Sequence, residues 1–228
     1  MPEPVTPTSG LGVLHLFHRL DREIDRGAVV AAVEDARAAG DQVVVAAILG
    51  HKADIAFMAL GQDLWRLRRL QTALASAGLA LVDSYASLTE VSEYAQGAPE
   101  QMKQTRLFPQ LPPEQKPVFC FYPMSKRREA DQNWFTLPYE QRSELMHQHG
   151  STGRKFAGRV LQVVTGSTGL DDYEWGVTLF CANPDALKEV VYAMRFDEAS
   201  AVYAEFGRFY IGMVATVDEA LAATVPGS

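Results

Sequence analysis

The sequence QVVVAAILGHKADIAFMAL, residues 42–60, contains two apolar runs on either side of Gly50-His51-Lys52. The first run, 42–49, is rich in β-branched Val and Ile, and the second, 53–60, is apolar at most positions. Short apolar runs that are bounded by turn residues are typical of buried strands. We therefore expect two adjacent strands joined by a turn at 50–52.

The segments that flank this pair predict a helix and then a strand on each side. Before the pair, residues 25–39 have the apolar spacing of an amphipathic helix, and residues 11–20 form an apolar run typical of a strand. After it, the leucine spacing in 63–77 predicts a second helix, and 79–91 predicts a final strand. The resulting order, β-α-β-β-α-β, is the ferredoxin-like arrangement.

The second half of the chain repeats this order of elements. Between the halves, residues 99–116 contain four prolines, which indicates a linker. We expect an α+β protein with two tandem ferredoxin-like domains, residues 11–98 and 117–228. The elements expected in the second half are a strand at 117–124, a helix at 138–149 stopped by Gly150, strands at 156–165 and 173–182, a helix at 184–194, further helix over 197–204, and a strand at 207–214.

The composition is that of an ordinary globular protein and disfavours several classes. A formal net charge of −7 argues against nucleic acid, whose phosphates need a basic surface. No apolar run reaches the roughly 18 residues of a membrane span, and the first residues lack the pattern of a signal peptide. Cys120 and Cys181 have no metal-binding spacing. We expect a cytoplasmic protein with reduced thiols.

One expected strand, FCFYPMSK, carries residues that suit neither a plain core nor plain solvent. Side chains alternate along a strand, so Tyr122, Met124 and Lys126 share one face. Phe119 and Phe121 lie on the other face, which is a core face. The alternative to a special surface is an edge strand whose second face is half open to water.

Two further positions in this half are unusual. His149 falls on the apolar stripe of its helix with Leu145 and Met146, whereas His147 falls outside it. Such an imidazole is a candidate metal ligand, and the commoner alternative is a buried, hydrogen-bonded histidine. Gln162 interrupts a β-branched face, so it either bonds to neighbouring backbone or faces a polar ligand in a cavity. Together these positions suggest a pocket for a large ligand.

Several motifs between residues 106 and 210 stand in the order of a known family. They are RLFP (106–109), YPMSKRR (122–128), NWF (133–135), HG (149–150), GR (153–154), TGS (165–167), DDYEWGVTLF (171–180) and MRFDEASA (194–201), with GHKADIAFMAL (50–60) and DSYASLTEVSEY (83–94) in the first half. With these motifs the chain resembles the coproheme decarboxylases of the chlorite dismutase-like superfamily over nearly its whole length. EWGVTLF together with MRFDEASA is the most specific part of the likeness.

The resemblance implies two ferredoxin-like domains of the dimeric α/β-barrel type, with haem in the C-terminal one and subunits in a homopentamer. It implies an oxidoreductase that uses hydrogen peroxide to decarboxylate iron coproporphyrin III (coproheme). Two propionates become vinyl groups through a tyrosyl radical, and haem b is the product. Coproheme is then both substrate and cofactor, and ferrochelatase is the implied donor of coproheme in the cell.

Position by position, the resemblance implies His149 as the iron ligand and Gln162 as the distal pocket residue. Tyr122 matches the tyrosine that becomes a radical, and Lys126, expected beside it, holds a carboxylate or assists its loss. Four propionates require cationic partners. The other implied pocket contacts are those of Arg106, Met124 through its backbone, Trp134, Arg195 and Ser200.

Three other functions are open on the sequence. A chlorite dismutase would release dioxygen from chlorite, but in the family that activity goes with a distal arginine, where this chain has Gln162. A non-catalytic haem carrier or sensor would keep His149 without needing Tyr122 and Lys126 together. A structural ring with an empty pocket would need none of these residues.

Some acidic residues have two interpretations. Asp171, Asp172 and Glu174 resemble a metal cluster, but a turn into a strand commonly uses such residues. Glu198 either orients His149 as a hydrogen-bond partner or lies on a helix surface.

Overall fold

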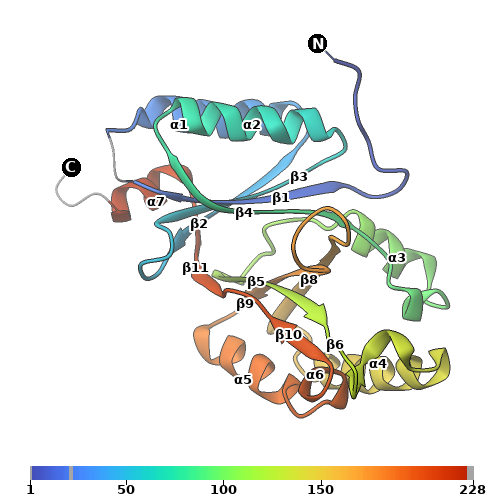
Figure 1. Cartoon of the computed structure of the whole chain (residues 1–228). Helices are drawn as coiled ribbons and strands as arrows, with labels where there is room; N and C mark the ends of the chain where they lie inside the picture. The colour runs from blue at the N-terminus through green and yellow to red at the C-terminus, as the bar shows by residue number, and fades with distance from the viewer. Residues whose placement is uncertain (1, 21–22, 225–228) are drawn as a thin grey trace.

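The computed structural model describes residues 2–20 and 23–224 and shows an α+β fold in which two βαββαβ halves follow each other (Figure 1). The first half consists of β1 (Gly12–Arg19), α1 (Arg26–Ala38), β2 (Gln42–Ile48), β3 (Ile55–Gly61), α2 (Leu64–Ser76) and β4 (Ala80–Thr89). Asp25 and Asp63 begin the two helices, because their side chains accept backbone N–H groups of the first turn. The predicted elements of this half are confirmed to within two residues.

The second half has the expected order with additions and three corrections. Its elements are β5 (Val118–Lys126), β6 (Arg128–Glu129), β7 (Gln132–Asn133), α4 (Tyr139–Arg154), β8 (Val160–Gly166), β9 (Trp175–Cys181), α5 (Pro184–Met194), α6 (Glu198–Ala201), β10 (Ala204–Phe206), β11 (Tyr210–Ala215) and α7 (Val217–Thr224). Between the halves lie η1 (Glu93–Ala95) and α3 (Glu100–Leu107), and η2 (Trp134–Thr136) follows β7.

The predicted helix stop at Gly150 is wrong. Gly40 and Gly78 end their helices with φ of 93° and 97°, but Gly150 is not among the glycines with positive φ, and α4 continues to Arg154. Consequently the strand expected from residue 156 begins only at Val160. The helix expected over 197–204 is the single turn α6, because the chain leaves it to form β10 against β5.

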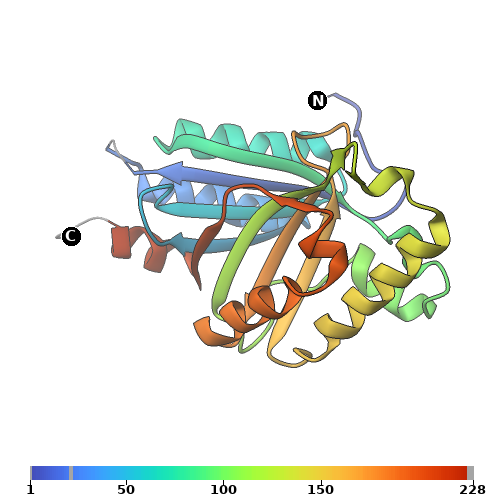
Figure 2. The same ribbon diagram turned by 60° about the horizontal axis from the view of Figure 1, so that its bottom comes forward.

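The sheet closes into a barrel that both halves build. Among the described residues, nine strands lie in the order β10-β5-β11-β2-β3-β1-β4-β8-β9, and β9 also pairs with β5. Every strand of the sheet except β10 therefore has a neighbour on each side, and each half contributes four strands to the closed ring in ferredoxin-like order. The halves join where β11 pairs with β2 and where β4 pairs with β8 (Figure 2). The domain division at 99–116 stays a prediction, since these strands share one sheet.

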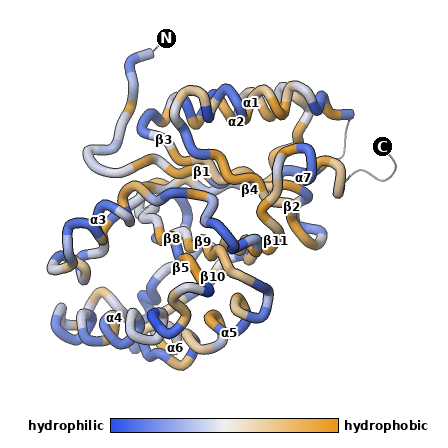
Figure 3. The backbone as a smooth tube through the Cα atoms, turned by 180° about the vertical axis from the view of Figure 1, so that it is seen from behind, coloured by the Kyte–Doolittle hydropathy of each residue, from blue (hydrophilic) through white to orange (hydrophobic). Residues whose placement is uncertain are grey.

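Helices cover the outer faces of the barrel, and aromatic side chains fill its inside. Helices α1, α2 and α7 lie on the strands of the first half, and α4, α5 and α6 lie on those of the second half (Figure 1). Phe119 and Phe121 point inward and are almost fully buried, as predicted. Strand β5 lies between β9 and β11, so the edge-strand alternative is wrong. Figure 3 shows the apolar strands enclosed by more polar helices.

Two expectations about the whole chain can be compared with the structure. Within residues 2–20 and 23–224, every helix is too short or too polar to traverse a lipid bilayer. Cys120 and Cys181 are buried and free.

Candidate functional site

A cavity of about 1720 Å³ lies between the outer face of β5, β8 and β9 and the helices that cover it. This volume exceeds the roughly 300–1,000 Å³ of sites for ordinary small ligands. The segments η1 and α3, which lie between the two halves, complete the wall. The lining includes all nine residues expected at the site: Arg106, Tyr122, Met124, Lys126, Trp134, His149, Gln162, Arg195 and Ser200. Their chemical roles stay predictions.

The floor of the cavity is an aliphatic sheet surface with one polar residue at each side. Tyr122 pairs with Val177, and Val177 pairs with Val164, so these side chains form one row across three strands. Gln162 lies in the next row, two strands from β5, about 10 Å across the sheet from Tyr122. Its side chain is exposed to the cavity and has no hydrogen-bond partner among the described residues. Of the two interpretations of Gln162, the cavity-facing one holds.

Tyr122 is held by aromatic neighbours rather than by hydrogen bonds. Its ring stacks on Phe209 with centroids 4.3 Å apart and meets Phe206 edge-on at 5.7 Å. Burial raises the pKa of the phenol, so the hydroxyl keeps its proton at neutral pH. The residue therefore presents an intact O–H group to the cavity from a fixed ring.

Lys126 shares the cavity with Tyr122, but its ammonium points elsewhere. The two residues are four positions apart on β5, about 13 Å along the strand. The Lys126 Nζ donates to the Ala199 carbonyl and lies 4.1 Å from the centre of the Trp134 ring. Burial lowers the pKa of Lys126 to about 8, against the opposing effect of Glu174. The expectation that Lys126 lies beside Tyr122 holds for the strand face and not for the ammonium.

His149 lies beside a carboxylate that the sequence interpretation missed. Its Nδ1 is 3.3 Å from Asp197 Oδ2 and 3.4 Å from Ser200 Oγ, and Thr152 donates to the other oxygen of Asp197 at 2.8 Å. Glu198 is exposed, so its helix-surface interpretation holds. A carboxylate on one imidazole nitrogen is the usual way to aim the other at a metal. Asp197 stands next to Glu198 in sequence, and only the path of the chain between α5 and α6 tells which acid turns inward.

The electrostatic surroundings favour neutral His149. Burial lowers its pKa, the charge of Lys126 lowers it further, and Asp197 raises it. Neutral imidazole is the form that binds metals. The exposed side chain of His147 lines the same cavity, so a second imidazole is available there.

The rim of the cavity is cationic and polar. Arg106 on α3 and Arg195 after α5 are side chains that line the opening, as does Arg154. Guanidinium groups bind carboxylates through paired hydrogen bonds. The cavity thus combines an aliphatic floor, an aimed imidazole and a basic rim, which suits a large flat ligand with a metal ion and several carboxylates.

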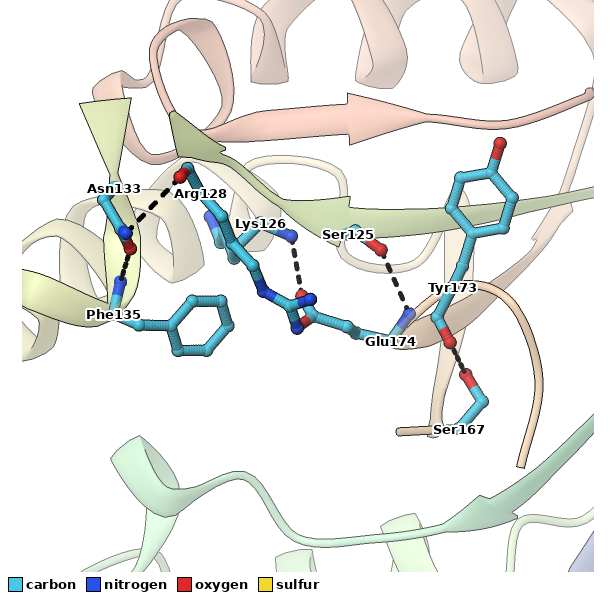
Figure 4. Close-up of polar contacts among 8 residues, drawn as sticks. All are labelled: Ser125, Lys126, Arg128, Asn133, Phe135, Ser167, Tyr173 and Glu174. Atoms are coloured by element: carbon cyan, nitrogen blue, oxygen red, sulfur yellow. Dashed lines mark hydrogen bonds and ion pairs between the residues drawn. The ribbon is translucent and has the colours of Figure 1, made fainter. Parts of the chain in front are cut away.

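Glu174 is a second residue whose contacts the sequence interpretation did not predict. In the described part of the chain, no group of three His, Cys, Asp or Glu side chains could hold a metal ion, so the metal hypothesis for Asp171, Asp172 and Glu174 is wrong. Asp171 accepts the Ala86 N–H at 2.8 Å instead. Glu174 is 6% exposed and binds the end of β5, as Figure 4 shows. Its position just before an apolar strand was the one available signal.

Comparison with known proteins finds a matching family model and several similar proteins. The family model described as chlorite dismutase matches residues 23–215. A coproheme decarboxylase from Staphylococcus saprophyticus is 44% identical over 181 residues, which are 75% of this chain and 72% of that protein. A longer putative heme-binding protein from Natronomonas pharaonis is 38% identical across 92% of this chain, which spans 40% of its length. The solved structure of a haem-binding protein from Thermus thermophilus is 36% identical, with a TM-score of 0.83 and 98% of each chain covered.

Proposed function

The chain belongs to the chlorite dismutase family, and we propose that within this family it is a coproheme decarboxylase that makes haem b. One observation carries the proposal beyond the likeness: Tyr122 and His149 open on the same large cavity, whose rim is cationic. The cavity volume, the aimed imidazole and the basic rim all fit a metallated porphyrin with four propionates. An iron porphyrin would be held in this cavity by His149 through its iron, and Gln162 and the valines of the sheet would line the same space.

Each residue has a task that its surroundings support. Bound coproheme supplies the redox chemistry that hydrogen peroxide starts. The protonated phenol of Tyr122 can lose an electron and a proton together and then take a hydrogen atom from the β-carbon of a propionate. That propionate then loses carbon dioxide and a further electron and becomes a vinyl group. The guanidinium of Arg106 neutralises a carboxylate in the cavity. The ammonium of Lys126 can do the same only after it turns from the Ala199 carbonyl toward the ligand.

Two other activities have weaker support. A chlorite dismutase would need a distal group that promotes dioxygen release, and Gln162 presents a neutral amide at that position. A haem carrier would have no use for a buried, proton-bearing phenol in an aromatic clamp. Both alternatives are outcomes of the test that follows.

Mass spectrometry of coproheme, incubated with the protein and hydrogen peroxide, tests the proposal. We expect the ligand to lose two carboxyl groups in turn, through an intermediate with three propionates. A ligand that binds and keeps all four carboxyl groups would make the protein a carrier. Vigorous dioxygen release from chlorite by the haem-loaded protein would make it a chlorite dismutase.

We further infer, from the family resemblance, a cytoplasmic homopentamer that receives coproheme from a ferrochelatase. Light scattering on the purified protein measures the mass of the assembly, with five times 25.1 kDa as the expected result. Transfer of coproheme from a loaded ferrochelatase, followed by absorbance, tests the donor.

A further inference from the structure

Glu174 binds the last residues of β5 through both its backbone N–H and its side-chain carboxylate. Its backbone N–H donates to the Met124 carbonyl at 3.1 Å and to Ser125 Oγ at 3.2 Å. Its carboxylate accepts the backbone N–H of Lys126 at 2.8 Å through one oxygen and the guanidinium of Arg128 through the other (Figure 4). The carboxylate is buried while Arg128 is 65% exposed, so the ion pair runs from the inside of the fold to its surface.

Arg128 begins a short hairpin that returns the chain to the cavity. Strands β6 and β7 pair Arg128 with Asn133, and the Trp134 N–H donates to the Arg127 carbonyl at 3.0 Å. The Arg128 guanidinium lies 5.1 Å from the centre of the Phe135 ring. Asn133 accepts the Phe135 N–H at 3.0 Å. Arg128 therefore contacts both Glu174 and the far end of the hairpin.

The residues after this hairpin form one wall of the cavity. Trp134 is 2% exposed, and the Lys126 ammonium makes a cation–π contact with its ring. Phe135 lines the cavity opening beside it. The hairpin that positions Trp134 and Phe135 starts at the end of β5, and Glu174 binds β5 at that end.

We propose that Glu174 is a positioning residue that acts through the backbone at the end of β5 and through Arg128 of the hairpin 127–135, and so holds this wall of the cavity in place before the ligand binds. A buried carboxylate is stable only while its hydrogen bonds and its cation are present. The carboxylate of Glu174 therefore favours the one arrangement in which the backbone N–H of Lys126 and the guanidinium of Arg128 both reach it. Preformed sites bind more tightly because less ordering accompanies binding. The effect on coproheme rests on the proposed function, and the effect on the hairpin does not.

Hydrogen exchange on the ligand-free protein tests the first part. Glu174→Gln and Arg128→Met each remove the ion pair, and we expect faster amide exchange in peptides that cover 125–135. Asp172→Asn is the matched control, because it removes an exposed carboxylate from the same turn without touching β5. Arg128→Met keeps the test open if Glu174→Gln does not fold, since the Arg128 side chain is largely in solvent. Unchanged exchange in both variants would overturn the proposal.

Coproheme binding, measured by quenching of tryptophan fluorescence, tests the second part. We expect Glu174→Gln to weaken affinity about tenfold, and less than that in an Arg128→Met background, because residues that act through one another are not additive. Faster exchange with wild-type affinity and product yield would reduce Glu174 to a structural contact. Absence of binding by the wild-type protein would instead contradict the proposed function and leave the exchange result intact.

Discussion

At the scale of single residues, Tyr122 gives the sharpest test of chemistry. Its hydroxyl has no hydrogen-bond partner among the described side chains, so Tyr122→Phe keeps the stack on Phe209 and the packing of the floor. We expect unchanged coproheme affinity and no haem b after peroxide, because phenylalanine has no O–H hydrogen to give. Absorbance titration and mass spectrometry measure the two properties. Wild-type yield of haem b in this variant would remove Tyr122 from the mechanism.

The two histidines of α4 provide a matched pair. His149 is partly buried and has Asp197 on its Nδ1, whereas His147 is exposed on the same cavity. We expect His149→Ala to change the ferric absorbance and resonance Raman spectra of the bound ligand and to weaken its binding, because the iron loses its imidazole. His147→Ala is the control and should leave the spectra unchanged. The reverse result would make His147 the ligand.

Two other histidines link stability to pH. Burial lowers the pKa of His15 from 6.5 to about 3 and that of His18 to about 4. The unfolded chain therefore binds protons that the folded chain refuses, so the free energy of unfolding falls as pH drops below 6.5. Each of the two histidines lowers the free energy of unfolding by about 1.4 kcal/mol for each pH unit between 6.5 and its pKa in the folded protein, and it has no such effect above pH 6.5. Urea unfolding at pH 7 and pH 5 should show a smaller loss for His15→Leu than for the wild type.

Residue-level predictions succeeded where one helix or strand decides the direction of a side chain. The face of β5 and the stripe of α4 follow from periods of 2 and 3.6, which put Tyr122 and His149 on the cavity. The contacts of Asp197 and Glu174 were not predicted, because the residues that they contact lie far away in sequence. No local pattern shows which acid of a pair turns toward another element.

At the scale of elements, a buried ion pair joins α2 to the start of β2. Arg66 donates to both oxygens of Asp41, whose side chain is 2% exposed. Arg66→Met leaves this carboxylate buried and unpaired, so we expect a loss of about 1–3 kcal/mol in the free energy of unfolding. Arg68→Met, on the exposed face of α2, should cost much less. Equal melting temperatures for the two variants would show that the pair contributes little.

Element ends were predictable where capping residues mark them. Asp25 and Asp63 start their helices, and Gly40 and Gly78 stop them in a left-handed conformation. The helix end predicted at Gly150 was wrong, because a glycine can also adopt the helical conformation inside a helix that continues beyond it. The length of α6 was overestimated, because the pairing of β10 with β5 outweighs the local helix propensity of the residues after α6.

At the scale of the whole molecule, barrel closure was implied by family resemblance and by no pattern within the chain. Strand order inside each half follows from the ferredoxin-like topology. The joints of β11 with β2 and of β4 with β8 connect residues that are more than 70 positions apart. Periodicity carries no information on such pairings, because any strand with a suitable face could form them.

Closure has a consequence for folding, because the inside of the barrel belongs to neither half alone. Phe17 of β1 stacks on Tyr210 of β11 at 3.8 Å, and Phe121 of β5 lies 4.1 Å from His15 and 5.3 Å from Tyr85. We expect the full chain to unfold in a single calorimetric transition whose calorimetric and van't Hoff enthalpies agree at fixed protein concentration. Fragments 11–98 and 117–228, expressed separately, should expose this aromatic face and should be unfolded or aggregated until they are mixed. Two resolved transitions, or a well-dispersed NMR spectrum from either fragment, would instead mean that each half has a sufficient core of its own.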